Sequence, residues 1–249
     1  MKLYKYLFSA VIIASTASCS EDYFDVNNSV TAPTTTSLPP QYRIQGAIEN
    51  TVATAQYRGI REVLGIVQYG SQNVSRYYSE SWVNEMTNGN YFLWQNAYVY
   101  ALPNTADLIH LGKEYDAPNY VAVGKILRAY TLGMVTDQYG DIVLDETYDS
   151  TSSMNITPSF ETQEVVYQRI IQLLDEAIAE LDMESSIGLN DEGGDVLYQG
   201  DQEKWKKFAY SIKARYLNHL SKKSSLYDPQ AIIAAAEKGI NSNDLNALI

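Results

Sequence analysis

The chain is poor in the residues that most catalytic and metal sites use. Cys19 is the only cysteine among 249 residues, so no disulfide can form within the chain. His110 and His219 are the only histidines, and neither belongs to a metal-binding spacing such as HExxH. The sequence also has no GxSxG nucleophile motif and no GxxxxGK[ST] phosphate-binding loop. We therefore expect no enzymatic activity, no metal site and no cofactor.

Basic residues are also few, because 18 Lys and Arg stand against 30 Asp and Glu. Without residues 1–18, which contain Lys2 and Lys5, 16 basic and 30 acidic residues remain, a net charge of −14. Contacts to phosphates need clustered Lys and Arg, so the charge argues against binding to nucleic acid or to anionic lipid headgroups. Tyrosine, in contrast, is abundant at 21 residues. Its apolar ring and polar hydroxyl suit both wet helix interfaces and ligand-binding surfaces.

The N-terminus has the layout of a secretory signal. Lys2 and Lys5 precede an apolar stretch at residues 7–14, which is too short to span a bilayer, and small residues lead to Cys19. A cysteine at this point resembles a bacterial lipobox, in which the thiol is acylated after cleavage. We predict a signal peptide at residues 1–18, lipidation of Cys19 and a Ser/Thr/Asn/Pro-rich tether at residues 19–40. The alternative is an ordinary signal peptide with an incidental cysteine.

From residue 41 onward the apolar residues recur at helical spacing. This pattern predicts helices from Gln41, over 94–111 and over 119–136. Three more are expected to begin at Ser159 or Thr162, at Asp201 and at Asp228, which are N-cap residues. The helical spacing is interrupted in three stretches, where we expect long structured loops: 70–92, 137–159 and 184–200. The fold class is therefore all-α, and the paired helices resemble a tetratricopeptide-like scaffold. No tetratricopeptide consensus occurs at its expected period.

Three segments in the right order resemble motifs of the SusD/RagB family of outer-membrane nutrient-binding lipoproteins of Bacteroidetes. The first is LGMVTDQYGDIVLDET at 132–147, where Val143 and Thr147 depart from the family pattern. The second is FETQEVVYQRIIQLLDEAIAEL at 160–181. The third is DVLYQGDQEKWKKFAYSIKAR at 195–215, where Tyr210 and Ile212 depart from the pattern. The residues that carry the match in the first and third segments are Asp137, Tyr139, Gly140, Asp141, Gly200, Asp201, Lys204, Trp205, Phe208 and Arg215.

We interpret these motif residues as scaffold. Gly140 permits a tight turn, Asp201 caps a helix, and Trp205 and Phe208 anchor that helix in the core. Lys204, Lys207, Lys213 and Arg215 are expected to pair with acidic side chains. Four acidic residues could in principle supply a glycosidase pair, but turn capping explains them better: Asp137, Asp141, Asp145 and Glu146.

The resemblance implies a lipoprotein on the outer face of the outer membrane that captures a nutrient, most often a glycan. It also implies a SusC-like TonB-dependent transporter as partner, over which residues 41–249 would act as a SusD-like helical domain. Family members are about twice as long, so we expect a fragment or a truncated product. The alternatives are a helical-repeat adaptor without a ligand and a member that binds peptides or glycoproteins.

Residues 76–94 have the chemistry of a sugar-binding loop. Sugar rings bind on flat aromatic faces flanked by a few polar side chains, and loops on a rigid scaffold often carry function. The candidate ligand-binding residues are Arg76, Tyr77, Tyr78, Trp82, Asn84, Asn88, Tyr91 and Trp94. The alternative is that Trp82 and Trp94 are buried between helices and bind nothing.

Overall fold

The regular structure of the described residues is helical. A computed structural model describes residues 38–55, 67, 69–70, 91–144, 157–190 and 192–243, within a unit that spans Pro39–Ile249. Its helices are α3 (Ile44–Val52), α5 (Tyr91–Gln95), the π-helix η3 (Asn96–Ala101), α6 (Leu102–Glu114), α7 (Pro118–Tyr139), α8 (Gln163–Glu180), α9 (Gln202–His219) and α10 (Pro229–Lys238), with short 3₁₀ turns η1 (Pro40–Tyr42) and η4 (Leu220–Lys222). The prediction of an all-α fold is confirmed.

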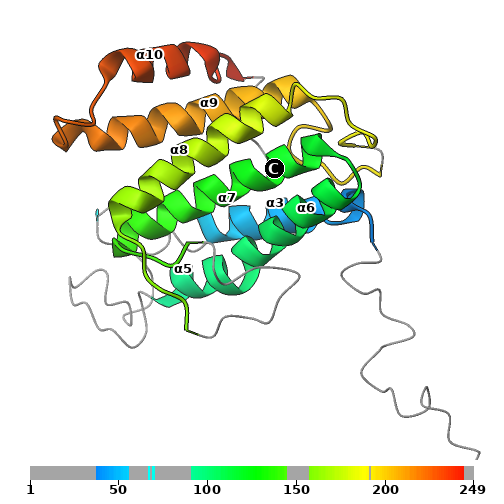
Figure 1. The fold of residues 1–249 in the computed structure, drawn as a ribbon, viewed down its shortest axis with the longest axis horizontal. Coiled ribbons are helices and arrows are strands. Elements are labelled where there is room, and N and C mark those ends of the chain that lie inside the picture. The colour runs from blue at the N-terminus through cyan, green and yellow to red at the C-terminus, as the bar shows by residue number, and fades with distance from the viewer. Residues whose placement is uncertain are drawn as a thin grey trace, which may run out of the picture. The chain divides into compact units, whose positions relative to one another are not determined.

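Consecutive helices lie side by side from α6 to α10, as Figure 1 shows, and α3 packs against α6 and α7. Short connections, such as residues 115–117 between α6 and α7, make neighbouring helices antiparallel. The layout is therefore a row of helix pairs, which is the arrangement that the tetratricopeptide-like interpretation predicted.

Helix α7 lies at the centre and is buried on nearly all sides. The apolar residues whose helical spacing predicts this helix are Val123, Leu127, Tyr130 and Met134. In the structure almost every side chain from Asn119 to Ala129 is buried, whereas Tyr130 and Met134 are half-buried. The spacing marks only part of the buried surface, because α7 is covered by α3, α6, α8 and α9 together. A helix enclosed in this way has no polar face for the periodicity to reveal.

The close approach of α9 to α7 depends on a glycine. A Cβ atom at Gly133 of α7 would lie 2.0 Å from Cζ of Tyr216 on α9, so no larger residue fits there unless the Tyr216 ring or its helix moves. Tyr216 is fully buried, and its hydroxyl donates a hydrogen bond of 3.0 Å to the carbonyl oxygen of Tyr130. Gly133 therefore sets the distance at which α7 and α9 pack.

Helix ends follow local rules. The side chain of Asp201 accepts a hydrogen bond from the backbone N–H of Lys204 at 3.0 Å, and that of Asp228 from Gln230 at 3.0 Å. Helix α8 is capped by Thr162 rather than by Ser159. These caps satisfy N–H groups that the first turn leaves free. The predicted starts of α9 and α10 are confirmed, and the start of α8 is resolved between the two candidates.

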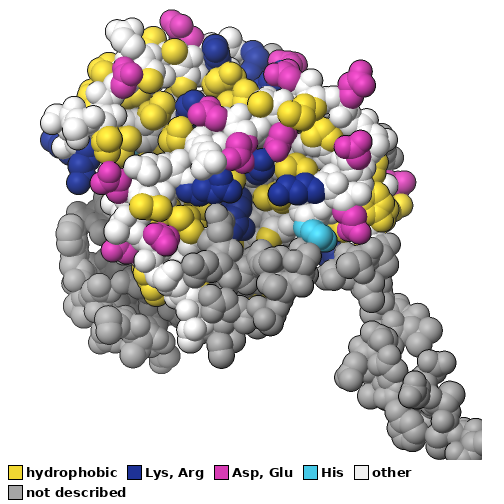
Figure 2. All heavy atoms as spheres, in the orientation of Figure 1, with side chains coloured by type: hydrophobic (Ala, Val, Ile, Leu, Met, Phe, Trp, Pro, Cys, Tyr) yellow, Lys and Arg dark blue, Asp and Glu magenta, His cyan; other side chains and the backbone are white. Residues whose placement is uncertain are grey.

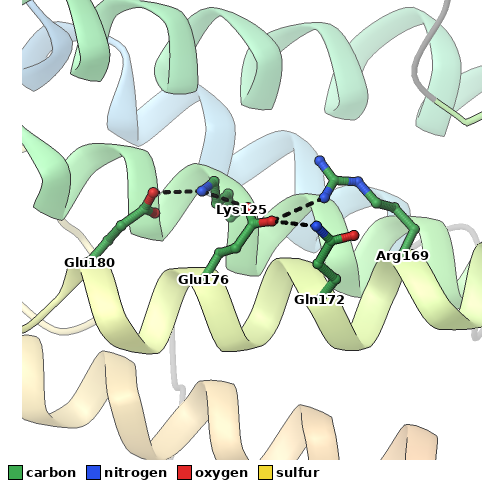
Figure 3. Close-up of polar contacts among 5 residues, drawn as sticks. All are labelled: Lys125, Arg169, Gln172, Glu176 and Glu180. Atoms are coloured by element: carbon green, nitrogen blue, oxygen red, sulfur yellow. Dashed lines mark hydrogen bonds and ion pairs between the residues drawn. The ribbon is translucent and has the colours of Figure 1, made fainter.

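A buried ion-pair network fixes α8 against α7 (Figure 3). Lys125 of α7 is 8% exposed, and its Nζ lies 2.7 Å from Glu176 Oε2 and 2.5 Å from Glu180 Oε1, both on α8. Arg169 and Gln172 also contact Glu176, at 3.3 and 2.8 Å. Burial alone would raise the pKa of Glu176, but the hydrogen bonds and positive charges around it outweigh burial and lower it. The network therefore favours one register of α8 on α7.

The charges on the surface are mixed. Acidic and basic side chains are interspersed on the face shown in Figure 2, with hydrophobic side chains between them. Across the part of the chain that the structure describes, no helix is both long and apolar enough to cross a membrane.

Candidate functional site

Four aromatic side chains meet where α5, η3, the end of α7 and the approach to α8 come together. We call this group the Trp94 surface; it consists of Trp94, Tyr98, Tyr139 and Phe160. The ring of Trp94 lies 4.5 Å from Tyr98, 5.3 Å from Tyr139 in an edge-on arrangement, and 5.9 Å from Phe160. Phe160 and Trp94 are nearly parallel, with 22° between their planes. Such ring spacings are typical of favourable aromatic pairs.

The Trp94 surface is buried on one side and open on the other. Tyr98 is buried, and its hydroxyl donates a hydrogen bond of 2.5 Å to the carbonyl oxygen of Val143. Trp94 and Tyr139 are half-buried and pack against the core. Phe160 is 63% exposed, which is unusual for a phenylalanine that stacks on a tryptophan. Trp94 is therefore neither fully buried nor fully exposed, and the choice between a ligand-binding and a purely structural role for it stays a prediction.

The other predicted ligand-binding residues cannot be placed on this surface. Tyr91 is the first residue of α5, and its side chain lies outside the described part of the structure. Arg76, Tyr77, Tyr78, Trp82, Asn84 and Asn88 lie outside the described residues, as do Cys19, Asp145 and Glu146. Their roles stay predictions. Sequence reasoning missed Tyr98 and Phe160. The aromatic spacing of Trp94 and Tyr98 on one helix face was a signal for Tyr98, whereas no local pattern marked Phe160.

The first family motif builds the junction between α7 and α8. Helix α7 runs on through Tyr139, so Asp137 lies in the helix rather than in the predicted loop. Gly140 then ends the helix at a φ of 80°, which favours glycine. A side-chain oxygen of Asp141 accepts a hydrogen bond of 2.9 Å from the backbone N–H of Gln163. In return, the Gln163 side chain donates to the carbonyl oxygen of Thr136 at 2.7 Å.

A backbone bridge extends this junction toward the Trp94 surface. Ile142 and Glu161 exchange two backbone hydrogen bonds of 3.1 and 2.8 Å in an antiparallel bridge. We call the bridge and the two side-chain hydrogen bonds of Asp141 and Gln163 the α7–α8 clip; it consists of Thr136, Asp141, Ile142, Glu161 and Gln163. The clip is next to the surface in sequence, because Tyr139 precedes Gly140 and Phe160 precedes Glu161.

Asp137 takes part in a second polar group, on the α9 side of the junction. Its carboxylate accepts a short hydrogen bond from the hydroxyl of Tyr167 and lies 3.2 Å from Nδ1 of His219. Burial, together with the hydrogen bond and charge of Asp137, raises the pKa of the Tyr167 hydroxyl. Both Asp137 and Asp141 thus hold helices in place. For Asp137 and Asp141 these contacts favour a structural role over a glycosidase pair; Asp145 and Glu146 lie outside the described residues, so their role stays a prediction.

The third motif folds around a buried carboxylate that sequence reasoning did not single out. Asp195 is fully buried and accepts four hydrogen bonds. Its donors are the backbone N–H groups of Leu197, Tyr198 and Gly200, at 2.8–3.1 Å, and Nε1 of Trp205 at 2.8 Å. Gly200 has a φ of 87°, which lets the loop close on the carboxylate. The signal was available, because Asp195 begins the motif that ends in the Trp205 helix.

Fewer of the motif's basic residues form ion pairs than expected. Lys213 pairs with Asp175, and Lys206, which was not expected to pair, contacts Asp182 and Glu203. In the described ranges Lys204, Lys207 and Arg215 have no salt bridge within 4.0 Å. Trp205 is fully buried and Phe208 packs against the core as expected. Among these same residues no group of three His, Cys, Asp or Glu side chains could hold a metal ion.

The fold and site define a class of protein: a helical scaffold that presents a half-open aromatic surface and uses its motif carboxylates to hold helices together. The chain belongs to a SusD-like family described as "Starch-binding associating with outer membrane", whose model matches residues 27–249. Proteins of this family bind ligands and are not enzymes. The predicted resemblance to the SusD/RagB family and the prediction of a non-enzyme are confirmed.

Solved structures agree with the family assignment. A SusD/RagB family protein from Bacteroides thetaiotaomicron superposes with a TM-score of 0.68 at 27% identity, covering 85% of this chain and 45% of that one. A protein named as chitin-binding, for which no organism is given, matches with a TM-score of 0.65 at 26% identity, covering 84% and 45%. A SusD homologue from Bacteroides fragilis, at 21% identity and a TM-score of 0.62, shares the fold and covers 84% and 43%. No curated protein matches the chain by sequence. The chain thus spans less than half the length of these solved relatives.

Proposed function

We propose that this protein captures a glycan at the outer surface of the cell and delivers it to a SusC-like TonB-dependent transporter. The family description supports a starch-type ligand and an association with the outer membrane. The name of the chitin-binding relative supports a polysaccharide more generally. Because the chain spans about 45% of those relatives, the activity of the whole protein is part of the proposal.

The observation that carries the proposal is the half-open Trp94 surface. A ring that is 63% exposed, stacked on a half-buried tryptophan, offers the apolar face on which a sugar ring can pack. The buried side of the group holds it in place against the core, so little freedom is lost when a ligand binds. The polar groups that would orient the sugar are proposed to come from the preceding segment: Arg76, Tyr77, Tyr78, Trp82, Asn84 and Tyr91.

The proposed attachment to the membrane is through lipid on Cys19. Residues 1–18 would be removed as a signal peptide and residues 19–40 would link the lipid to the helical domain. Stable attachment needs more than one acyl chain, since a single chain binds only marginally. The acidic composition of the chain supports attachment by lipid rather than by charge.

The test is calorimetric titration of the full chain with a chito-oligosaccharide and with a malto-oligosaccharide. Trp94→Ala is expected to weaken binding about tenfold or more, because a central aromatic anchor contributes roughly 2 kcal/mol to an interface. Phe160→Ala should have a smaller effect in the same direction, because its exposed ring contacts the ligand from one side.

Tyr227→Ala is the matched control, since Tyr227 is also an exposed aromatic residue but lies between η4 and α10. It should bind like the unmodified chain. Full affinity in Trp94→Ala would contradict the proposed site. A chain that binds neither oligosaccharide, but does bind the transporter or a peptide, would favour the adaptor or peptide-binding alternative.

A further inference from the structure

Phe160 lacks the packing that normally fixes an aromatic ring. At 63% exposure it buries little apolar area, so the hydrophobic effect contributes little to its position. Among the described residues its ring contact is with Trp94, a residue of a helix distant in the sequence. The orientation of Phe160 must therefore come largely from the backbone that carries it.

That backbone is held by the α7–α8 clip. Glu161, the next residue, is bonded in both directions to Ile142, and Gln163 is bonded through its backbone N–H to Asp141. The Gln163 side chain also reaches the carbonyl oxygen of Thr136, which already accepts from the backbone N–H of Gly140. A chain fixed at two places within three residues of Phe160 has few ways to reorient it.

The same clip is tied to the helix of Trp94 from the other side. Val143, next to the bridge residue Ile142, accepts the hydrogen bond from Tyr98, whose ring contacts that of Trp94. Leu144 follows and accepts from the buried guanidinium of Arg128 at 3.2 Å. Residues 142–144 thus connect the backbone next to Phe160 with Tyr98, which contacts Trp94, and with α7. The positions of the Phe160 and Trp94 rings therefore both depend on this short backbone segment.

We infer that Asp141 and Gln163 are positioning residues for the ligand, although neither side chain belongs to the Trp94 surface. The bond from the Gln163 backbone N–H to Asp141 and the bond from the Gln163 side chain to the Thr136 carbonyl oxygen hold Phe160 beside Trp94 in the orientation that a sugar ring requires. The inference rests on the proposed function. Loss of either bond lets the Phe160 backbone leave this arrangement for part of the time, and apparent affinity falls with the fraction that remains competent.

The experiment compares Asp141→Ala, Asp141→Asn and Gln163→Ala with Gln172→Ala. Gln172 is a matched control, because it is a glutamine of the same helix that bonds Glu176 and not the clip. Affinity for the oligosaccharide that the unmodified chain binds is measured at a temperature where each variant is folded by circular dichroism. Asp141→Ala and Gln163→Ala are expected to bind about five- to tenfold more weakly, as a competent fraction of about 10–20% gives.

The Asp141→Asn variant is expected to bind nearly as well as the unmodified chain, because an amide oxygen can still accept the bond from Gln163. Gln172→Ala should leave affinity unchanged. If Gln172→Ala weakens binding as much as Gln163→Ala does, the effect comes from α8 in general and the inference is wrong.

A second readout does not need a ligand. Fluorine NMR of the chain labelled with 5-fluorotryptophan gives one resonance for each of Trp82, Trp94 and Trp205, and Trp94→Phe identifies that of Trp94. Asp141→Ala should shift or broaden the Trp94 resonance and leave that of Trp205 in place. An unchanged Trp94 resonance together with unchanged affinity overturns the inference. If the unmodified chain binds neither oligosaccharide, the proposed function fails, and the Trp94 resonance alone decides whether the clip positions the surface.

Discussion

Two clusters of aromatic rings, each centred on a tryptophan, have similar ring spacings but differ in burial and in their polar partners. Trp205 contacts Tyr198 at 5.2 Å and Phe208 at 6.0 Å, and Trp94 contacts its neighbours at comparable distances. Trp205 is fully buried, however, and its indole N–H is bonded to the buried Asp195. Trp94 is half-buried and ends in an exposed phenylalanine.

The spacing between rings is therefore not enough to distinguish a core cluster from an exposed aromatic surface. Burial and the polar partner separate them. In the Trp205 cluster a carboxylate with four donors closes the loop over the rings, so the cluster stabilises the fold. In the Trp94 surface the polar bonds run through the backbone beside the rings and leave one side open. Three predictions test this contrast.

The largest effect is expected from the same substitution in each cluster. Trp205→Ala should lower the free energy of unfolding by about 3–5 kcal/mol, because it removes a fully buried ring. Trp94→Ala should cost only about 1–2 kcal/mol, because part of its ring already faces solvent. Urea denaturation followed by circular dichroism measures both. Equal losses would contradict the distinction between core and surface.

Asp195→Asn tests the polar partner of the buried cluster. The amide cannot accept from all four donors, so at least one buried N–H loses its partner at about 1–3 kcal/mol each. We expect a loss of about 2–4 kcal/mol in the free energy of unfolding and an unchanged affinity for the oligosaccharide probe. A matched change, Asp201→Asn, keeps a good capping residue and should cost a few tenths of a kcal/mol. A large loss of affinity in folded Asp195→Asn would show that the two clusters are coupled.

The smallest effect is expected for the ion pair between Lys125 and Glu176, which joins α7 to α8 and belongs to neither aromatic cluster. The pKa of Glu176 is lowered in the folded state, so its stabilising contribution is present above its ordinary value of 4.5 and is lost as the pH falls through the lowered value. Lys125→Met should therefore cost about 1 kcal/mol at pH 7, with Glu176 about a third exposed, and less in acid. Lys204→Met, which removes a lysine without a salt bridge in the described residues, is the control. A loss that does not depend on pH would assign the effect to packing.

Features fixed by neighbouring residues could be predicted from the sequence. The caps at Asp201 and Asp228 and the all-α class follow from short-range hydrogen bonds and from periodicity. The burial of α7 on several faces could not be predicted, since it results from four other helices that the sequence does not place. Asp137 was assigned to a loop because the motif after it contains Gly140, whereas the helix ends only at that glycine.

The candidate site was predicted in part. Trp94 was named because residues 76–94 combine aromatic and polar side chains, and in the structure it lies on a half-open surface. Phe160 was missed because its partner comes from a remote part of the chain and only the fold brings the two rings together. Asp195 was given only as the first residue of the third motif segment, since a buried carboxylate with four donors and a solvated loop aspartate look alike in a sequence.

The bridge between Ile142 and Glu161 has a further consequence for how such a chain can change. The two backbone hydrogen bonds between Ile142 and Glu161 make residues 143–160 a loop that is closed at its base. Doubling the length of such a loop costs only about 0.6 kcal/mol in closure entropy. Insertions between Leu144 and Phe160 that keep the bridge are therefore expected to cost the helices little stability.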